Sequence, residues 1–296
     1  IHHALLNYID NTTNDDESKF IELIQNISSD DLVKNKQELK DFLYLISTIS
    51  INHHITPDLF SKIQKIILKL KAGIAQNFSN LEIFNIFKKC KKLLLFLFNE
   101  KILIPDHSIY DIITAMKYKN MNYPNYFYLE FKDFMEKSTF SEEIELFEEK
   151  RKIGENEDYI CSLIRNDSIN EFVVYVNKKN ILLDVEIENS IFETNLLLMN
   201  KKVSLIEYAA FYGSIQIFQF LKLNGVELNP LLWLYSIHGR NPELFHLLEE
   251  SNVELDTEMK LQCLKESIKC HHNEFTEYIL NQYYINDIKI DILPDK

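Results

Sequence analysis

The sequence predicts an all-α protein, and three observations lead to this fold class. The 296 residues include only 5 glycines and 6 prolines, too few for the many tight turns of a β protein. Apolar residues recur with helical spacing along most of the chain. A helix–turn–helix unit also recurs in the C-terminal half, which predicts a helical repeat array there.

Residues 1–158 are predicted to form an N-terminal helical bundle or irregular solenoid. Their apolar periodicity predicts helices at 17–27, 36–51, 57–72, 79–98, 106–119, 124–136 and 141–152. Pro57, Ser79 and Asp106 are typical helix-start residues and support three of these helices. The short links between the helices predict antiparallel packing of neighbours.

The clearest repeat is SLIEYAAFYGSIQIFQFLKLNGVELN, residues 204–229. Its apolar positions predict two short helices, the first ended by Gly213 and the second by Gly225. Glycine adopts the left-handed conformation at a helix C-terminus without a steric penalty, so we expect positive φ at both positions.

The unit recurs on both sides of this copy. Residues 232–255 place Gly239 opposite Gly213, and Asn252 opposite Gly225, where asparagine also tolerates a left-handed conformation. Two weaker copies cover the ranges 159–180 and 264–280, with Asp167 and Cys270 at the glycine position. The segment 181–203 is an insertion, expected to be an extended hairpin plus a short helix. The last residues, 286–296, are expected to begin another repeat or an outgoing hairpin.

These residues resemble ankyrin repeats, whose pattern is TPLHxAAxxGHxxIVxLLLxxGADVN. Ala209 and Ala210 match the paired small residues, and Ser204 retains the capping position although the Pro and His of the motif are replaced. The resemblance covers about 159–285 and implies degenerate ankyrin-type repeats in an α-solenoid. With the helical leader, the chain is similar to a large protozoan ankyrin-repeat family whose N-terminal helical part is a domain of unknown function.

The resemblance implies a protein-binding surface on the inner helices and loop tips. The corresponding positions carry aromatic and arginine side chains, which are typical interface anchors: Phe211, Tyr212, Trp233, His238 and Arg240. We expect Tyr212, His238 and Arg240 to be exposed. For Phe211 and Trp233, exposure as anchors and burial beneath neighbouring segments both stay open.

The sequence contains few motifs of catalysis, cofactor binding or metal binding. It contains no nucleophile-elbow, zinc-protease, phosphate-loop or dinucleotide motif, so we expect no catalytic residues and no cofactor. Adjacent histidines at 2–3, 53–54 and 271–272 point in different directions on a helix and are expected to be surface or turn residues, so no metal site is predicted. The four cysteines form no CxxC pair and are expected to be reduced thiols.

Charge defines the alternative functions. The formal charge of −13 opposes binding to nucleic acid. Within this acidic chain, residues 62–92 contain 8 lysines and one acid, Glu82, on amphipathic helices. We call these lysines the lysine island. One interpretation is that they surround a packed core. The other is that they face an acidic partner or a membrane surface.

The sequence therefore predicts a non-catalytic scaffold that binds a protein partner through the inner face of the repeats. The alternative is a peripheral membrane or phospholipid-binding adaptor that uses the basic helices in 62–92. The longest apolar run is Leu93 to Phe98, far shorter than a membrane span, so a cytoplasmic, soluble protein is expected.

Overall fold

The computed structural model describes residues 1–10, 16–29, 32–135, 143–199 and 202–283. These residues are mostly helical, which confirms the all-α class, and their strands are limited to a pair, β1 (Glu186–Ile187) and β2 (Val203–Ser204). The chain divides into two compact units: unit 1 contains 1–159 and 187–202, and unit 2 contains 160–186 and 203–296. None of the helices described is both long and apolar enough to cross a bilayer.

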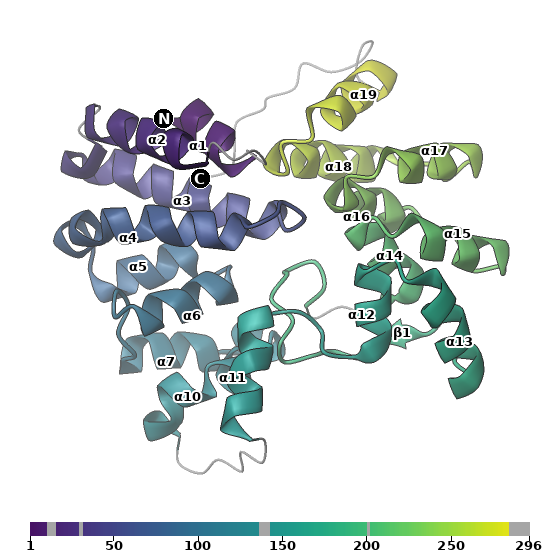
Figure 1. Cartoon of the computed structure of the whole chain (residues 1–296), viewed down its shortest axis with the longest axis horizontal. Coiled ribbons are helices and arrows are strands. Elements are labelled where there is room, and N and C mark those ends of the chain that lie inside the picture. The colour runs from purple at the N-terminus through teal and green to yellow at the C-terminus, as the bar shows by residue number, and fades with distance from the viewer. Residues whose placement is uncertain (11–15, 30–31, 136–142, 200–201, 284–296) are drawn as a thin grey trace. The chain divides into compact units, whose positions relative to one another are not determined.

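Unit 1 is a succession of helices, many of which pack against the next helix in the chain (Figure 1). Its elements are α1 (His2–Ile9), α2 (Asp16–Ser29), the 3₁₀ turn η1 (Leu32–Lys34), α3 (Lys36–Asn52), α4 (Leu59–Asn77), α5 (Asn80–Phe87), α6 (Lys91–Asn99), α7 (His107–Thr114), α8 (Met116–Asn120), α9 (Tyr123–Tyr126), α10 (Tyr128–Phe131), the 3₁₀ turn η2 (Lys132–Phe134) and α11 (Ile144–Ile153). One contiguous apolar core runs from α1 to α10. The helix α1 was not predicted from the sequence.

Local start signals position several of these helices. Ser79 caps α5 in a reciprocal capping box with Glu82, and the Asp106 carboxylate accepts a hydrogen bond from the Ile109 amide at the start of α7. Pro57 was expected at the first helical position, but α4 begins two residues later, at Leu59. There the preceding residue has a left-handed backbone, with φ 55°.

The predicted helix at 79–98 is two helices. The helical conformation is interrupted between Phe87 and Lys91, where the backbone of Cys90 is extended, with φ −120° and ψ 95°. The Tyr123 hydroxyl donates to the carbonyl of Lys88 at the break, over 2.6 Å. A tyrosine distant in sequence therefore satisfies a backbone group that an unbroken helix would satisfy itself.

The middle of the insertion joins unit 1. Asn195 Nδ2 donates to the carbonyl of Ile51 over 3.1 Å, and Thr194 Oγ1 donates to the carbonyl of Gly154 over 2.7 Å. The sequence placed all of 181–203 with the repeats, whereas residues 187–202 belong to the N-terminal unit. The short helix expected in this insertion is absent from its described residues, 181–199 and 202–203.

Unit 2 is a series of helical pairs (Figure 1). The pairs are α12 (Tyr159–Arg165) with α13 (Ile169–Lys179), α14 (Leu205–Tyr212) with α15 (Ile215–Leu223), α16 (Leu231–Gly239) with α17 (Pro242–Glu250), and α18 (Thr257–Lys269) with α19 (Asn273–Tyr283). The first helices of successive pairs pack together, α14 against α16 and α16 against α18. The further repeat expected at 286–296 lies outside the described residues.

The turns of unit 2 recur with one backbone geometry. Left-handed residues follow the first helices at Asp167, Gly213, Arg240 and His271, and they follow the second helices at Asn180, Gly225 and Asn252. The predicted positive φ is confirmed at Gly213 (71°), Gly225 (86°) and Asn252 (54°). Left-handed residues therefore recur after the helices of the pairs, including positions where the residue is not glycine.

Gly239 was predicted to be a turn residue, but it is the last residue of α16, and Arg240 adopts the left-handed conformation instead, with φ 49°. Glycine is required at 239 for a different reason. A Cβ built there would lie 2.2 Å from the carbonyl oxygen of Ala210 and 2.9 Å from the amide nitrogen of Gly213. The two turns are therefore in backbone contact, and no side chain fits between them.

Polar links tie each pair to the next. The Asp167 carboxylate accepts hydrogen bonds from the amides of Gln216 and Ile217, both at 3.0 Å, and so caps α15 from the preceding pair. Asn241 caps its own helix α17 and donates through Nδ2 to the carbonyl of Gly213 over 3.1 Å. The core between the links is fully buried and mainly apolar, and it includes Ala210, Ser236, Phe218, Leu221, Leu244 and Leu248.

Candidate functional site

The C-terminal ends of α14, α16 and α18 adjoin, and four of the five predicted anchor residues lie at or near this row of ends. Phe211 stacks on the His238 ring, with centroids 5.2 Å apart, so α14 contacts α16. His238 in turn contacts Glu266 of α18. Tyr212 and Arg240 are half-buried and lie beside these contacts.

Trp233 belongs to the interior of unit 2. Its side chain is stacked on Tyr278, at 6.3 Å and 11°, and on Phe245, at 6.2 Å and 19°. Its indole N–H donates to the carbonyl of Val253 over 2.8 Å. Trp233 therefore connects α16 to α17 and α19. Exposure and burial were both open for Trp233 and Phe211, and the structure shows that both residues are buried.

The expectation that His238 is exposed is wrong, because only 2% of the residue is accessible. Its position follows from the packing of three consecutive first helices, which encloses the residues on the middle helix, α16. Tyr212 and Arg240 remain partly accessible. Tyr212 packs on the ring of Tyr208, with centroids 4.8 Å apart, and Arg240 donates to the carbonyl of Cys270.

Several lysines of the island have internal partners in unit 1. Lys62 is 4% exposed, donates to the carbonyls of Tyr8 and Ile9, and forms an ion pair with Asp16 over 3.2 Å. Lys71 donates to the carbonyl of Glu100 over 2.6 Å. These lysines hold helices together, which accounts for part of the positive charge in 62–92. His53, expected to be a surface or turn residue, is the C-cap of α3 and is buried.

Lys91 is fully buried and anchors the insertion. Its Nζ donates to the carbonyl of Glu193 over 3.0 Å and lies 5.3 and 5.1 Å from the ring centroids of Tyr123 and Tyr126. Burial lowers the pKa of Lys91 to about 7, against the opposing charge of Glu193, and burial raises the pKa of Glu193. The enclosure of the amine and its hydrogen bond to the insertion indicate a structural role.

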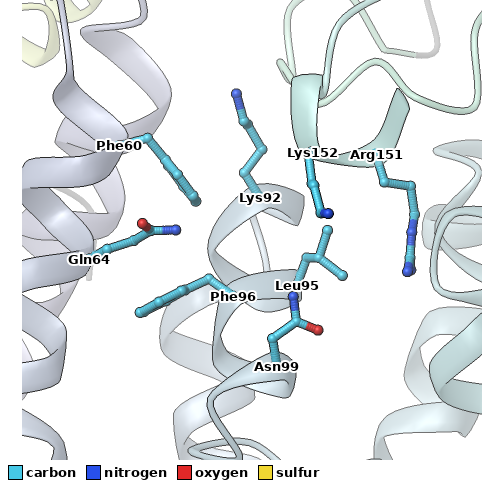
Figure 2. Close-up of a pocket in the computed structure, with 8 residues that line it drawn as sticks. All are labelled: Phe60, Gln64, Lys92, Leu95, Phe96, Asn99, Arg151 and Lys152. Carbon is cyan, nitrogen blue, oxygen red and sulfur yellow. The ribbon is translucent and has the colours of Figure 1, made fainter. Parts of the chain in front are cut away.

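Unit 1 contains a pocket of about 160 Å³ (Figure 2). It is lined by Phe60, Gln64, Lys92, Leu95, Phe96, Asn99, Arg151 and Lys152. Arg151 is bound to Glu130 at 2.7 Å, and Lys92 donates to the carbonyl of Ile153 over 2.8 Å. Lys152 is exposed. The pocket combines cationic and phenyl groups, which suits an anionic ligand with an apolar part.

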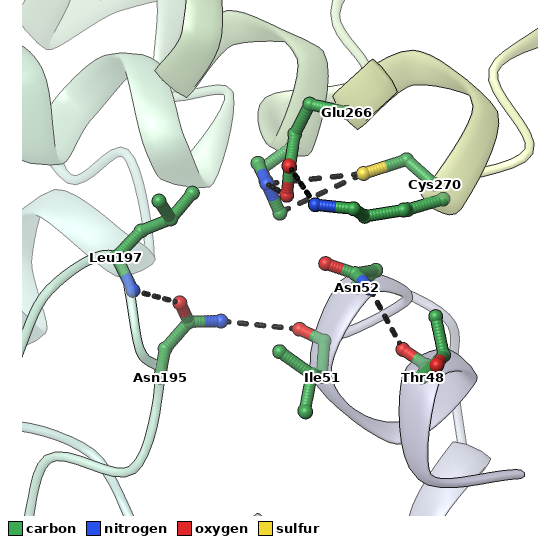
Figure 3. A network of polar contacts seen from close by, with 9 residues as sticks. Thr48, Ile51, Asn52, Asn195, Leu197, Glu266 and Cys270 are labelled. Atoms are coloured by element: carbon green, nitrogen blue, oxygen red, sulfur yellow. Dashed lines mark hydrogen bonds and ion pairs between the residues drawn. The ribbon is translucent and has the colours of Figure 1, made fainter. Parts of the chain in front are cut away.

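A second polar cluster links α16 to α18 in unit 2 (Figure 3). His238 Nε2 lies 2.9 Å from Glu266 Oε1, and Cys270 Sγ lies 3.8 Å from each ring nitrogen of His238. Burial tends to raise the pKa of Glu266, but the hydrogen bond with His238 and the charges of His238 and Lys269 lower it to about 2. Burial, together with the charge of Glu266, raises the pKa of the Cys270 thiol well above its usual range.

The three residues of this cluster offer one ligand atom each within 4.8 Å of one another, the one group of its kind in the described part of the chain. The sequence did not predict it, because the ligands come from two helices and have no motif spacing. A signal was nevertheless present. The repeat alignment placed Cys270 at the position of Gly239, next to His238 in the preceding copy, and this alignment could have been used to place the two side chains on adjoining turns.

The chain was compared with protein-family models, with curated proteins and with solved structures, and no match was found in any of the three. The structure confirms the helical class.

Replacing Glu266 by glutamine should remove a stabilisation that depends on pH. A carboxyl whose pKa falls from 4.5 unfolded to about 2 folded stabilises the native state above pH 4.5, and this contribution disappears as the pH falls through 2. We expect the variant to be less stable than wild type by about 2 kcal/mol near pH 6, after allowance for partial exposure, and equally stable near pH 2. Urea unfolding across this range measures the gap, and a gap independent of pH would contradict the assignment.

Proposed function

We propose that unit 2 is a degenerate ankyrin-type array and that the chain is a non-catalytic scaffold for a protein partner. The observation that carries the proposal is the recurrence of one helical pair with left-handed turns at equivalent positions. In such arrays each repeat contacts mainly its neighbours, so the array exposes a long continuous surface. Rigid presentation of side chains to a partner is the natural use of that surface.

The proposed binding surface follows the C-terminal ends of α14, α16 and α18. Tyr212 and Arg240 are the predicted anchors with accessible surface. Ile268, 45% exposed near the end of α18, extends the row, and Leu261, 38% exposed, lies two turns earlier on the same face of that helix. Tyrosine, tryptophan and arginine side chains near the centre of an interface contribute most of the binding energy, and the contacts around them exclude water.

Tyr212→Ala and Ile268→Ser should each weaken partner binding by about tenfold or more, equivalent to 1.4 kcal/mol. The partner is first identified by affinity capture with the full chain and mass spectrometry, and affinities are then measured by calorimetry with the purified partner. The matched control is Leu223→Ser on α15, because Leu223 is 84% exposed but belongs to a second helix. Circular dichroism verifies that each variant is folded. Normal binding by both surface variants would reject this surface.

A second candidate, binding to an anionic phospholipid surface, is supported by the basic pocket of unit 1. Lys152→Glu should then reduce sedimentation with phosphatidylserine vesicles, in a salt-sensitive manner. Lys119→Glu is the matched control, since Lys119 is an exposed lysine of unit 1 outside the pocket. Equal sedimentation with phosphatidylcholine vesicles, or an equal effect of the two variants, would exclude a lipid-specific role for the pocket.

A further inference from the structure

The cluster between α16 and α18 has the composition of a transition-metal site. An imidazole, a carboxylate and a thiol converge here: His238 lies on α16, Glu266 lies on α18, and Cys270 is the C-cap residue of α18. Nitrogen, oxygen and sulfur ligands of these kinds are those that Zn²⁺ takes in proteins. Glu266 and Cys270 are four residues apart and therefore lie on the same face of α18, one turn from each other.

Two of the three distances between ligand atoms are near those of a tetrahedral site. Ligand atoms on Zn²⁺ lie roughly 3.3 to 3.6 Å apart, because each bond to the metal is about 2.0 to 2.3 Å. The nitrogen–oxygen distance between His238 and Glu266 is 2.9 Å, and the sulfur–nitrogen distance between Cys270 and His238 is 3.8 Å. Because Cys270 Sγ lies 3.8 Å from both ring nitrogens, binding of an ion to one nitrogen requires the imidazole and the thiol to turn towards each other, besides changes of a few tenths of an ångström in these distances. The sulfur–oxygen pair, within 4.8 Å, must close further.

Neighbouring groups hold the ligands in place. Lys269 Nζ donates to Glu266 Oε2 over 2.9 Å, leaving Oε1 directed at His238. The Phe211 ring stacks on the imidazole, and Arg240 binds the carbonyl of Cys270. Partners of this kind orient the ligands of metal sites and reduce the rearrangement that binding requires.

We propose that His238, Glu266 and Cys270 bind one Zn²⁺ ion, with water in the fourth position. On binding, the Cys270 thiol loses its proton to solvent and the thiolate bonds to the metal, as does a deprotonated nitrogen of His238. The hydrogen bond between His238 and Glu266 is replaced by two metal–ligand bonds. Because binding releases protons, affinity rises with pH. The ion joins α16 to α18, so it stabilises the stacking of successive pairs, whether or not the surface of unit 2 binds a protein.

Cobalt provides the direct test, because Co²⁺ replaces Zn²⁺ and a cobalt–thiolate bond gives an intense near-ultraviolet absorption band. The full wild-type chain, under reducing conditions, is expected to bind one Co²⁺ with this band, and added Zn²⁺ should abolish the band by displacing the cobalt. Cys270→Ser should lose the band, and Glu266→Gln should bind at least about tenfold more weakly. Two controls should retain wild-type behaviour: His271→Asn, which preserves a residue tolerant of the left-handed turn, and Cys161→Ala in α12.

The outcomes are separable. Cobalt binding by wild type without a thiolate band would show adventitious binding, for example at the adjacent histidines, and would overturn the proposal. A band that persists in folded Cys270→Ser, or that disappears in Cys161→Ala, would also overturn it. The wild-type band is measured without any substitution, so the proposal stays testable even if Cys270→Ser fails to fold.

Discussion

Replacement of Trp233 by alanine should lower the free energy of unfolding of unit 2 by about 4 kcal/mol, the cost typical of deleting a buried tryptophan. The ring is 2% exposed and stacks between side chains of α17 and α19. Its removal leaves a cavity and also deprives the carbonyl of Val253 of its donor. Urea unfolding followed by far-ultraviolet circular dichroism measures the change.

Trp233→Phe is the matched control for this prediction. Phenylalanine keeps an aromatic ring in the stack but has no N–H for Val253, so a smaller loss of about 1 to 2 kcal/mol is expected. If Trp233→Ala unfolded at the same urea concentration as wild type, the side chain would be a surface residue. Trp233 would then return to the partner-binding surface.

Gly239→Ala is expected to destabilise unit 2 by about 2 to 3 kcal/mol through overpacking. Helix propensity alone predicts the opposite, because alanine within a helix is about 1 kcal/mol better than glycine. The new Cβ would lie 2.2 Å from the Ala210 oxygen and 3.0 Å from the Gly213 Cα, and both are backbone atoms that cannot rotate away. The sign of the change therefore distinguishes a tight backbone contact from an ordinary helix position.

The only tryptophan of the chain, Trp233, belongs to the same helix, so its fluorescence follows the unfolding of this region directly. Gly225→Ala is the control, because a Cβ at Gly225 meets nothing within 4 Å although φ is 86°. It should cost only the conformational strain, about 1 kcal/mol. A Gly239→Ala variant as stable as wild type would show that α14 and α16 are farther apart than in the structure.

The sequence predicted the features that depend on nearby residues. Gly213, Gly225 and Asn252 have the expected left-handed backbone, and the capping role expected of Ser204 is confirmed by a capping box with Glu207. Each of these features depends on a turn or cap within a few residues, so local steric and hydrogen-bonding preferences are sufficient to specify it.

The tertiary structure decided what depends on residues distant in the chain. Gly239 is needed for a backbone contact with the preceding pair, and His238 is enclosed by α14 and α18. Lys91 donates a hydrogen bond to the carbonyl of Glu193 in the insertion. The cluster of His238, Glu266 and Cys270 likewise forms only when α16 and α18 pack. Periodicity shows which face of a helix is apolar, but it does not show which other helix covers a given residue. Exposure and side-chain convergence were therefore determined by long-range packing.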